Sequence, residues 1–156
     1  MSWLPAPGPR CPPRPMLCPV VLVAALSGCT TGPEDAGRAA DCPAPVVSRE
    51  GVVEVPTDRG SVTALLFGDL PARTGQELKI VWRVTGDGGL TVRAVRPDGS
   101  TAEPAFGPEP HYTSNFDAPG DEWGTGFRFD GAGCWRIDVA RGGVSASLWV
   151  PVETQS

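Results

Sequence analysis

The residues of this sequence that could do chemistry are few, and they lie close together. His111, the only histidine, is followed by Asp117, Asp121 and Glu122. A histidine beside carboxylates could act as a general base, and converging carboxylates could bind Ca²⁺. However, their spacing fits no EF-hand loop, and we interpret the segment as a solvated acidic loop without a metal site. An enzyme that uses His111 and these carboxylates is kept as an alternative hypothesis.

Motifs of the common enzyme classes do not occur in the sequence. The chain has no Gly-x-Ser-x-Gly elbow, no phosphate-binding loop, no His-Glu-x-x-His and no Cys-x-x-Cys pair. A cysteine enzyme built on Cys134 and His111 would need a free thiolate and a group that orients the histidine. We therefore expect a protein that is not an enzyme and that binds no cofactor.

Aromatic residues offer a second route to function, because exposed Trp and Tyr side chains often anchor binding. Trp149 lies between Leu148 and Val150, which face the core of the predicted strand. Trp149 is therefore on the other, polar face of that strand. Tyr112 and Trp123 lie in a predicted loop. Tyr112, Trp123 and Trp149 are therefore the candidate residues of an exposed binding patch. The alternative is that Trp149 is buried by a second sheet or by the long loop.

The N-terminal segment has the organisation of a signal peptide. Two arginines, Arg10 and Arg14, precede the apolar run 16–26, which is shorter than the roughly 20 residues of a membrane span. The run ends at Leu26-Ser27-Gly28-Cys29, which resembles the lipobox of bacterial lipoproteins. This resemblance implies cleavage before Cys29, a lipid on its thiol, and a protein anchored to the extracytoplasmic face of the cell membrane. The alternative is an N-terminal membrane helix.

Removal of the signal peptide leaves an acidic chain with two unmodified cysteines. Residues 29–156 contain 11 basic and 18 acidic residues, a net charge of −7, and their arginines are scattered. This balance disfavours nucleic acid or anionic lipid as a surface partner. In an oxidising compartment Cys42 and Cys134 are expected to form a disulfide, which stabilises a domain by about 4 kcal/mol. Free thiols at both positions are the alternative.

The chain divides into a signal peptide (1–28), a lipidated cysteine with a flexible tether (29–41) and one structured domain (42–156). In the domain, apolar residues alternate with polar ones over 77–85, 134–139 and 144–152, and β-rich runs cover 52–55, 61–67, 90–95 and 126–129. The intervening turns predict three hairpins, formed by 52–55 with 61–67, by 77–85 with 90–95, and by 134–139 with 144–152.

The fold class follows from this pattern. About seven short strands separated by turns predict an all-β fold, an antiparallel β-sandwich of immunoglobulin-like type. Alternation places Trp82 and Trp135 in the core. The stretch from Ser100 to Trp123 contains four prolines and predicts no regular structure. The Cys42–Cys134 spacing is longer than that of immunoglobulin domains, so we expect the bridge to join the domain's N-terminus to a late strand.

Function is predicted only as a class. Loops Gly86–Gly89 and Phe106–Trp123 are expected to bind a ligand or a partner protein outside the cytoplasm. The alternative is a protease inhibitor, because Gly86-Asp87-Gly88-Gly89 resembles a loop of chagasin-like cysteine-protease inhibitors, although that family's other two loop motifs are absent. In addition, Gly133-Cys134-Trp135 resembles a segment of small exported bacterial proteins, a likeness that implies no activity.

Overall fold

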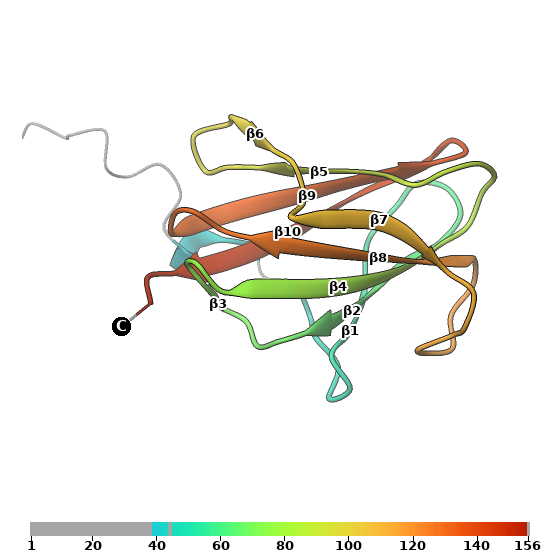
Figure 1. Cartoon of the computed structure of the whole chain (residues 1–156), viewed down its shortest axis with the longest axis horizontal. Helices are drawn as coiled ribbons and strands as arrows, with labels where there is room; N and C mark the ends of the chain where they lie inside the picture. The colour runs from blue at the N-terminus through green and yellow to red at the C-terminus, as the bar shows by residue number, and fades with distance from the viewer. Residues whose placement is uncertain (1–38, 44, 156) are drawn as a thin grey trace, which may run out of the picture. The chain divides into compact units, whose positions relative to one another are not determined.

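The structure is a computed structural model that describes residues 39–43 and 45–155. In these residues the chain forms ten β-strands and one short 3₁₀ helix, η2 (Ala39–Asp41). The strands form two five-stranded sheets that pack against each other as a β-sandwich (Figure 1). Among the described residues, no helix is long and apolar enough to span a membrane. The expected signal peptide and Cys29 lie outside the described residues.

One sheet, here called the β4 sheet, has the strand order β1-β2-β4-β8-β7. All its neighbouring strands are antiparallel. Its members are β1 (Val52–Glu54), β2 (Val62–Phe67), β4 (Glu77–Val84), β7 (Phe106–His111) and β8 (Asp121–Arg128).

The other sheet, here called the β9 sheet, has the strand order β3-β10-β9-β5-β6. Its members are β3 (Ala72–Arg73), β5 (Thr91–Val95), β6 (Thr101–Ala102), β9 (Gly133–Arg141) and β10 (Val144–Glu153). Strand β3 pairs parallel with β10, whereas the other pairs of this sheet are antiparallel. The prediction of an antiparallel sandwich was therefore wrong at this edge, where two residues of β3 pair with the end of β10.

The core lies between the sheets and is built by alternating side chains, as predicted. Trp82 on β4 is fully buried and Trp135 on β9 is 1 % exposed. Both indole groups are hydrogen-bonded: Trp82 Nε1 donates to Thr125 Oγ1 at 2.8 Å, and Trp135 Nε1 donates to the Gly131 carbonyl at 2.8 Å. These bonds remove the cost of burying the indole N–H groups.

Two of the three predicted hairpins are confirmed. Strands β1 and β2 pair antiparallel, and so do β9 and β10. The β9–β10 turn consists of Gly142 and Gly143, whose φ angles are 50° and 83°. Positive φ at both central residues matches the twist of the adjoining strands, and glycine adopts it without strain.

The predicted hairpin between 77–85 and 90–95 was wrong. Strand β4 pairs with β2 and β8, whereas β5 pairs with β9 and β6 in the other sheet. The connecting segment 85–90 therefore crosses from one sheet to the other. Packed sheets are only about 10 Å apart, so a glycine-rich segment of this length can either close a hairpin or change sheets.

The count of about seven strands was also too low, since β3, β6 and β7 were not expected. Strands β3 and β6 have two residues each, too few for a visible alternation. Strand β7 contains Pro108 and Pro110 and lies at an edge of its sheet, where proline is tolerated because no further strand needs its N–H. Strand β8 begins at Asp121, so Trp123 lies on a strand and not in a loop as predicted.

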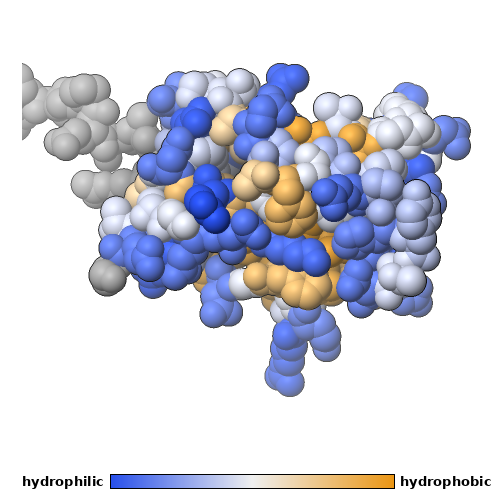
Figure 2. Space-filling model, in the orientation of Figure 1, coloured by the Kyte–Doolittle hydropathy of each residue, from blue (hydrophilic) through white to orange (hydrophobic). Residues whose placement is uncertain are grey.

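The outer face of the β4 sheet carries apolar as well as polar side chains. Phe67 is 48 % exposed and lies under Lys79, whose Nζ is 5.1 Å from the ring centre. Figure 2 shows hydrophobic groups between hydrophilic ones on the side of the molecule seen in Figure 1.

Candidate functional site

The two loops that the sequence predicted for binding lie at the same end of the sandwich. The β4–β5 connection (85–90), the β7–β8 loop (112–120) and the β9–β10 turn are all at the end opposite the chain's C-terminus (Figure 1). We call this region the loop end. Its position follows from the strand directions, because β4 and β9 finish here and β8 and β10 begin here.

Arg141, the last residue of β9, connects these loops from inside. Its side chain is 6 % exposed. Nη1 donates to the Val84 carbonyl at 2.6 Å, Nε donates to the Gly88 carbonyl at 2.8 Å, and Nη2 donates to Asp121 Oδ2. The guanidinium also lies 5.5 Å from the ring centre of Trp123. One buried cation thus holds the end of β4, the β4–β5 connection and the start of β8.

The β7–β8 loop is fixed separately, on the outer face of the β4 sheet. Cross-strand pairing puts Arg83, Glu122 and His111 side by side on β4, β8 and β7. The Glu122 side chain is only 2 % exposed, and it accepts hydrogen bonds from the backbone N–H of Asn115, at 2.9 Å, and from the Asn115 side chain. His111 Nδ1 lies 3.2 Å from Glu122 Oε1, and Arg83 Nη1 lies 3.7 Å from Oε2. The carboxylate therefore binds the loop to the sheet.

The pKa of Glu122 reflects this environment. Burial alone would raise it, but the hydrogen bonds from Asn115 and His111 outweigh that effect and hold the pKa below its ordinary value. Glu122 is consequently ionised at neutral pH and acts as an acceptor.

Arg83 adds further hydrogen bonds to the same loop. Its Nε donates to the Ala118 carbonyl at 2.9 Å, and Nη1 donates to Ser114 Oγ at 3.0 Å. Ser114, Asn115 and Ala118 are thus held against the sheet, and the exposed residues beside them are presented from a fixed frame.

Two glycines on β8 make room for the side chains of β7. A Cβ atom on Gly124 would lie 2.6 Å from His111 Nε2, and one on Gly126 would lie 2.0 Å from Phe106 Cε1. The imidazole and phenyl rings therefore lie directly over glycine backbone. This packing explains why Gly124 and Gly126 alternate with the inward-facing Thr125.

Tyr112 and Trp123 line one cavity at the loop end. The cavity has a volume of about 480 Å³ and is also lined by Arg83, His111 and Glu122. Tyr112 is 94 % exposed. Trp123 is half-buried against the end of the core, and its Nε1 is buried with no hydrogen-bond partner in the described part of the chain.

The third aromatic residue of the predicted patch lies elsewhere. Trp149 is half-buried on the outer face of the β9 sheet, paired across the strands with Arg136. The guanidinium of Arg136 lies 5.7 Å from the ring centre of Trp149. Alternation thus gave the correct face for Trp149, but the structure does not bring it together with Tyr112 and Trp123.

The acidic residues near His111 do not converge. Asp117 is exposed, Asp121 binds Arg141, and Glu122 faces His111. Residues 39–43 and 45–155 contain no cluster of three or more His, Cys, Asp or Glu side chains suited to a metal ion. The Glu122–His111 pair orients an imidazole, yet among the described residues no Ser, Thr or Cys side chain hydrogen-bonds to it.

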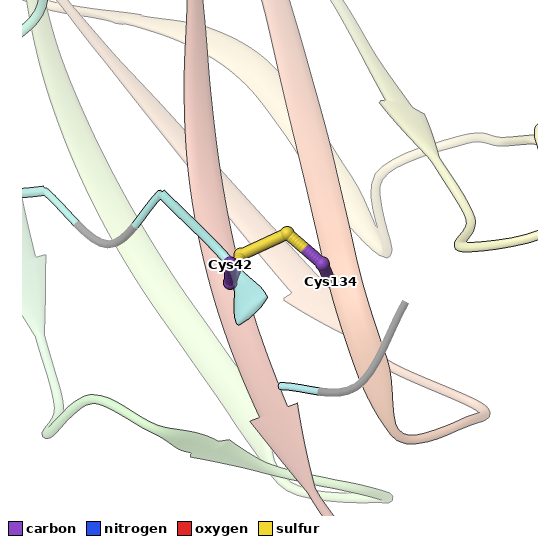
Figure 3. Close-up of a disulfide and its surroundings, with 2 residues drawn as sticks. All are labelled: Cys42 and Cys134. Carbon is purple, nitrogen blue, oxygen red and sulfur yellow. A yellow bond between two sulfur atoms is a disulfide. The ribbon is translucent and has the colours of Figure 1, made fainter. Parts of the chain in front are cut away.

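The disulfide joins the N-terminus of the domain to β9, as expected. Cys42 and Cys134 have a Cα–Cα distance of 5.1 Å and a sequence separation of 92 (Figure 3). Cys134 alternates with the buried Trp135, so the bridge lies on the outer face of the β9 sheet, and η2 contacts β9 and β10. The bridge is at the end of β9 opposite Arg141.

Sequence reasoning missed Arg141 and the glycine pair, although signals for both exist. Arg141 continues the alternation of Trp135, Ile137 and Val139, and therefore had to face inward. A charged residue in phase with a core-facing series indicates a buried cation that needs acceptors.

Comparison with known proteins gave no matching family model, no matching curated protein and no matching solved structure. The class of protein is therefore defined by the fold alone, as a two-sheet β-sandwich, and the site by its geometry.

Proposed function

We propose that this protein is a non-catalytic module, anchored by lipid at Cys29 to the extracytoplasmic face of the cell membrane, that binds a ligand or protein through its loop end. One observation carries the proposal: Arg141 ties the β4–β5 connection to the start of β8, so the two predicted binding loops are presented together. Loops on a rigid scaffold are common binding sites.

The strand order supports an immunoglobulin-like class. The order β2-β4-β8-β7 corresponds to strands A-B-E-D of an immunoglobulin domain, and β10-β9-β5 corresponds to G-F-C. On this correspondence the β4–β5 connection is the B–C loop and the β9–β10 turn is the F–G loop. In variable domains these two loops form part of the antigen-binding end.

The fixed geometry of the loop end also supports binding. A loop that is already ordered loses less conformational entropy when its partner binds. Here Glu122 and Arg83 hold the β7–β8 loop, while Tyr112 is almost fully exposed beside the cavity. An exposed tyrosine next to a polar cavity offers both apolar contact and a hydroxyl group to a partner.

The position of the disulfide indicates which end of the domain the proposed anchor would attach to. Cys42 is bound at the end of β9 opposite the loop end. The sequence predicts a flexible tether between Cys29 and the domain, and residues 39–41 at its end form η2. Because the proposed anchor precedes Cys42 in the chain, it would attach the domain at this end of the sandwich, and the loop end would be the free end.

Site-specific photo-crosslinking in the native host tests the binding surface. Benzoylphenylalanine replaces Tyr112 in the full-length chain, and in a control it replaces Phe67, which is exposed on the outer face of the β4 sheet. We expect an adduct at position 112 that is absent at position 67. No adduct at position 112, or the same adducts at both positions, would overturn the proposal.

Intact-mass analysis of protein from the host membrane tests the anchor. A mature chain that begins at Cys29 with an added lipid mass is expected, and this species should be absent in Cys29→Ser. A chain that retains residues 1–28 would refute the lipoprotein part of the proposal.

The inhibitor hypothesis uses the same surface. Residues Gly86 to Gly89 are all exposed at the loop end, as an inhibitory loop would need to be. Inhibition of papain-type proteases by the full-length protein would favour this function, and unchanged protease activity in excess protein would exclude it.

A further inference from the structure

The outer face of the β9 sheet contains a hollow that the proposed function does not use. It has a volume of about 520 Å³ and lies over β5, β9 and the first half of β10. Cross-strand pairing forms its floor from Thr91, Ala140 and Ser145 in one row. These side chains are short, whereas Arg93 in the next row and Arg136 in the row after it are long. The hollow results from this difference.

One side of the hollow is a fixed hydrogen-bond network. Arg136 Nε and Nη2 donate to the two carboxylate oxygens of Asp138 at 2.8 and 3.0 Å, and Ser147 Oγ donates to Asp138 at 2.7 Å. Trp149 stacks against Arg136 from the far side. Burial would raise the pKa of Asp138, but the hydrogen bonds from Arg136 and Ser147 hold it below the ordinary value.

Arg93 adds a second positive charge beside Asp138, so the positive charges in the hollow outnumber its single carboxylate. It is exposed, it pairs across the strands with Asp138, and among the described residues it forms no hydrogen bond or ion pair. Two arginines and one aspartate thus line the hollow and give it a net charge of +1 within an acidic domain. The hydroxyl groups of Thr91 and Ser145 likewise have no hydrogen-bond partner in residues 39–43 and 45–155.

From these observations we propose that the hollow binds a segment of a polyhydroxylated chain that carries one negative charge, such as an acidic sugar residue of a glycan. A planar carboxylate or a phosphodiester can accept two parallel hydrogen bonds from the Arg93 guanidinium. The hydroxyl groups of Thr91 and Ser145 are placed to bond sugar or polyol hydroxyls. A single negative charge matches the net charge of the hollow, and a neutral chain would leave Arg93 without a partner.

Calorimetric titration of the full-length protein tests this proposal. The probes are tetragalacturonate, which carries carboxylates, glycerophosphoglycerol, which carries a phosphodiester, and the neutral cellotetraose. The test variant is Arg93→Gln. The matched control is Arg128→Gln, which removes an exposed arginine from the outer face of the other sheet.

We expect an acidic probe to bind, and its affinity to fall about tenfold or more in Arg93→Gln while Arg128→Gln binds like wild type. Higher salt should also weaken binding, because the exposed charge is screened. Binding of only one acidic probe identifies which anion the site takes. The proposal would be overturned if cellotetraose bound as tightly as the acidic probes or if neither acidic probe bound. It would also be overturned if Arg93→Gln and Arg128→Gln lost the same affinity. The loop end is unchanged in Arg93→Gln. Crosslinking at position 112 therefore tests the proposed function separately from binding in the hollow.

Discussion

Replacing Arg141 by methionine is the most direct test of how the loop end is built. Methionine keeps most of the volume of the side chain but removes the charge and all its donors. The Val84 and Gly88 carbonyls then lose their hydrogen bonds from a buried guanidinium, at 2.6 and 2.8 Å in the wild type. Hydrogen bonds that involve a charged group contribute about 1.5–3 kcal/mol each.

The ion pair with Asp121 adds little to this value. The Asp121 side chain is 72 % exposed, so solvent screens its attraction to Arg141. We therefore expect the two carbonyl bonds to dominate, and the free energy of unfolding to fall by about 4 kcal/mol in Arg141→Met. This is a large part of the 5–15 kcal/mol that is typical of a domain.

Urea unfolding of the full-length protein provides the measurement. Arg141→Lys keeps the charge but cannot reach all three acceptors, and we expect a smaller loss of about 2 kcal/mol. Arg128→Met is the control, because the Arg128 side chain is 64 % exposed and its ion pair with Glu77 spans 3.8 Å. A surface change of this kind costs about 0.5 kcal/mol or less. A loss below about 1 kcal/mol in Arg141→Met, or a similar loss in the control, would refute the assigned role of Arg141.

Three further predictions concern stability and can be checked by the same unfolding measurement. Reduction of the Cys42–Cys134 disulfide should lower the free energy of unfolding by about 4 kcal/mol, and reductant should have no effect on the double Ser variant. Glu122→Gln should lower the free energy of unfolding most near neutral pH. Burial would raise the pKa of Glu122, but its hydrogen bonds outweigh that effect and lower the pKa. The stabilising effect of the carboxylate is therefore present above the ordinary pKa of about 4.3 and is lost as the pH falls through the folded-state pKa. A cost that does not change with pH would contradict this assignment. Gly126→Ala should lower the free energy of unfolding by about 1–3 kcal/mol, because the new methyl group meets the Phe106 ring. Gly131→Ala is the control and should be neutral, because its methyl group meets nothing within 4 Å. Equal losses in both variants would show that the Phe106 ring moves freely.

Local pattern predicted the parts of the fold that depend on one strand and its nearest neighbour. Alternation identified β4, β9 and β10 and placed Trp82 and Trp135 in the core. The β9–β10 hairpin was predictable because a two-glycine turn separates its strands. The Cys42–Cys134 pairing followed from counting the cysteines that the expected lipid and cleavage leave over.

The alternation of apolar and polar residues could not predict which strands pair when they are distant in the sequence. Alternation shows which face of β5 is buried, but not that β5 leaves the sheet of β4. Strand β7 has no alternation because Pro108 and Pro110 interrupt it, and it forms because β8 supplies a partner with space over Gly124 and Gly126.

The candidate site was predicted only in part for the same reason. Tyr112 and Trp123 share a cavity because β7 and β8 are neighbours, whereas Trp149 is on the other sheet. The contacts of Glu122 with Asn115 and Arg83 join two strands and a loop, and no short-range motif encodes such a set.

The edges of the two sheets restrict how a partner could bind. Three of the four edge strands are short: β1 has three residues, and β3 and β6 have two each. The fourth, β7, contains Pro108 and Pro110, which lack the N–H groups that an added strand would use. Short or proline-containing edges disfavour recognition by strand addition. We therefore expect the proposed binding to depend on side chains at the loop end or on the outer faces of the sheets. For this reason substitutions at Tyr112 and Arg93 test recognition more directly than changes to the edges.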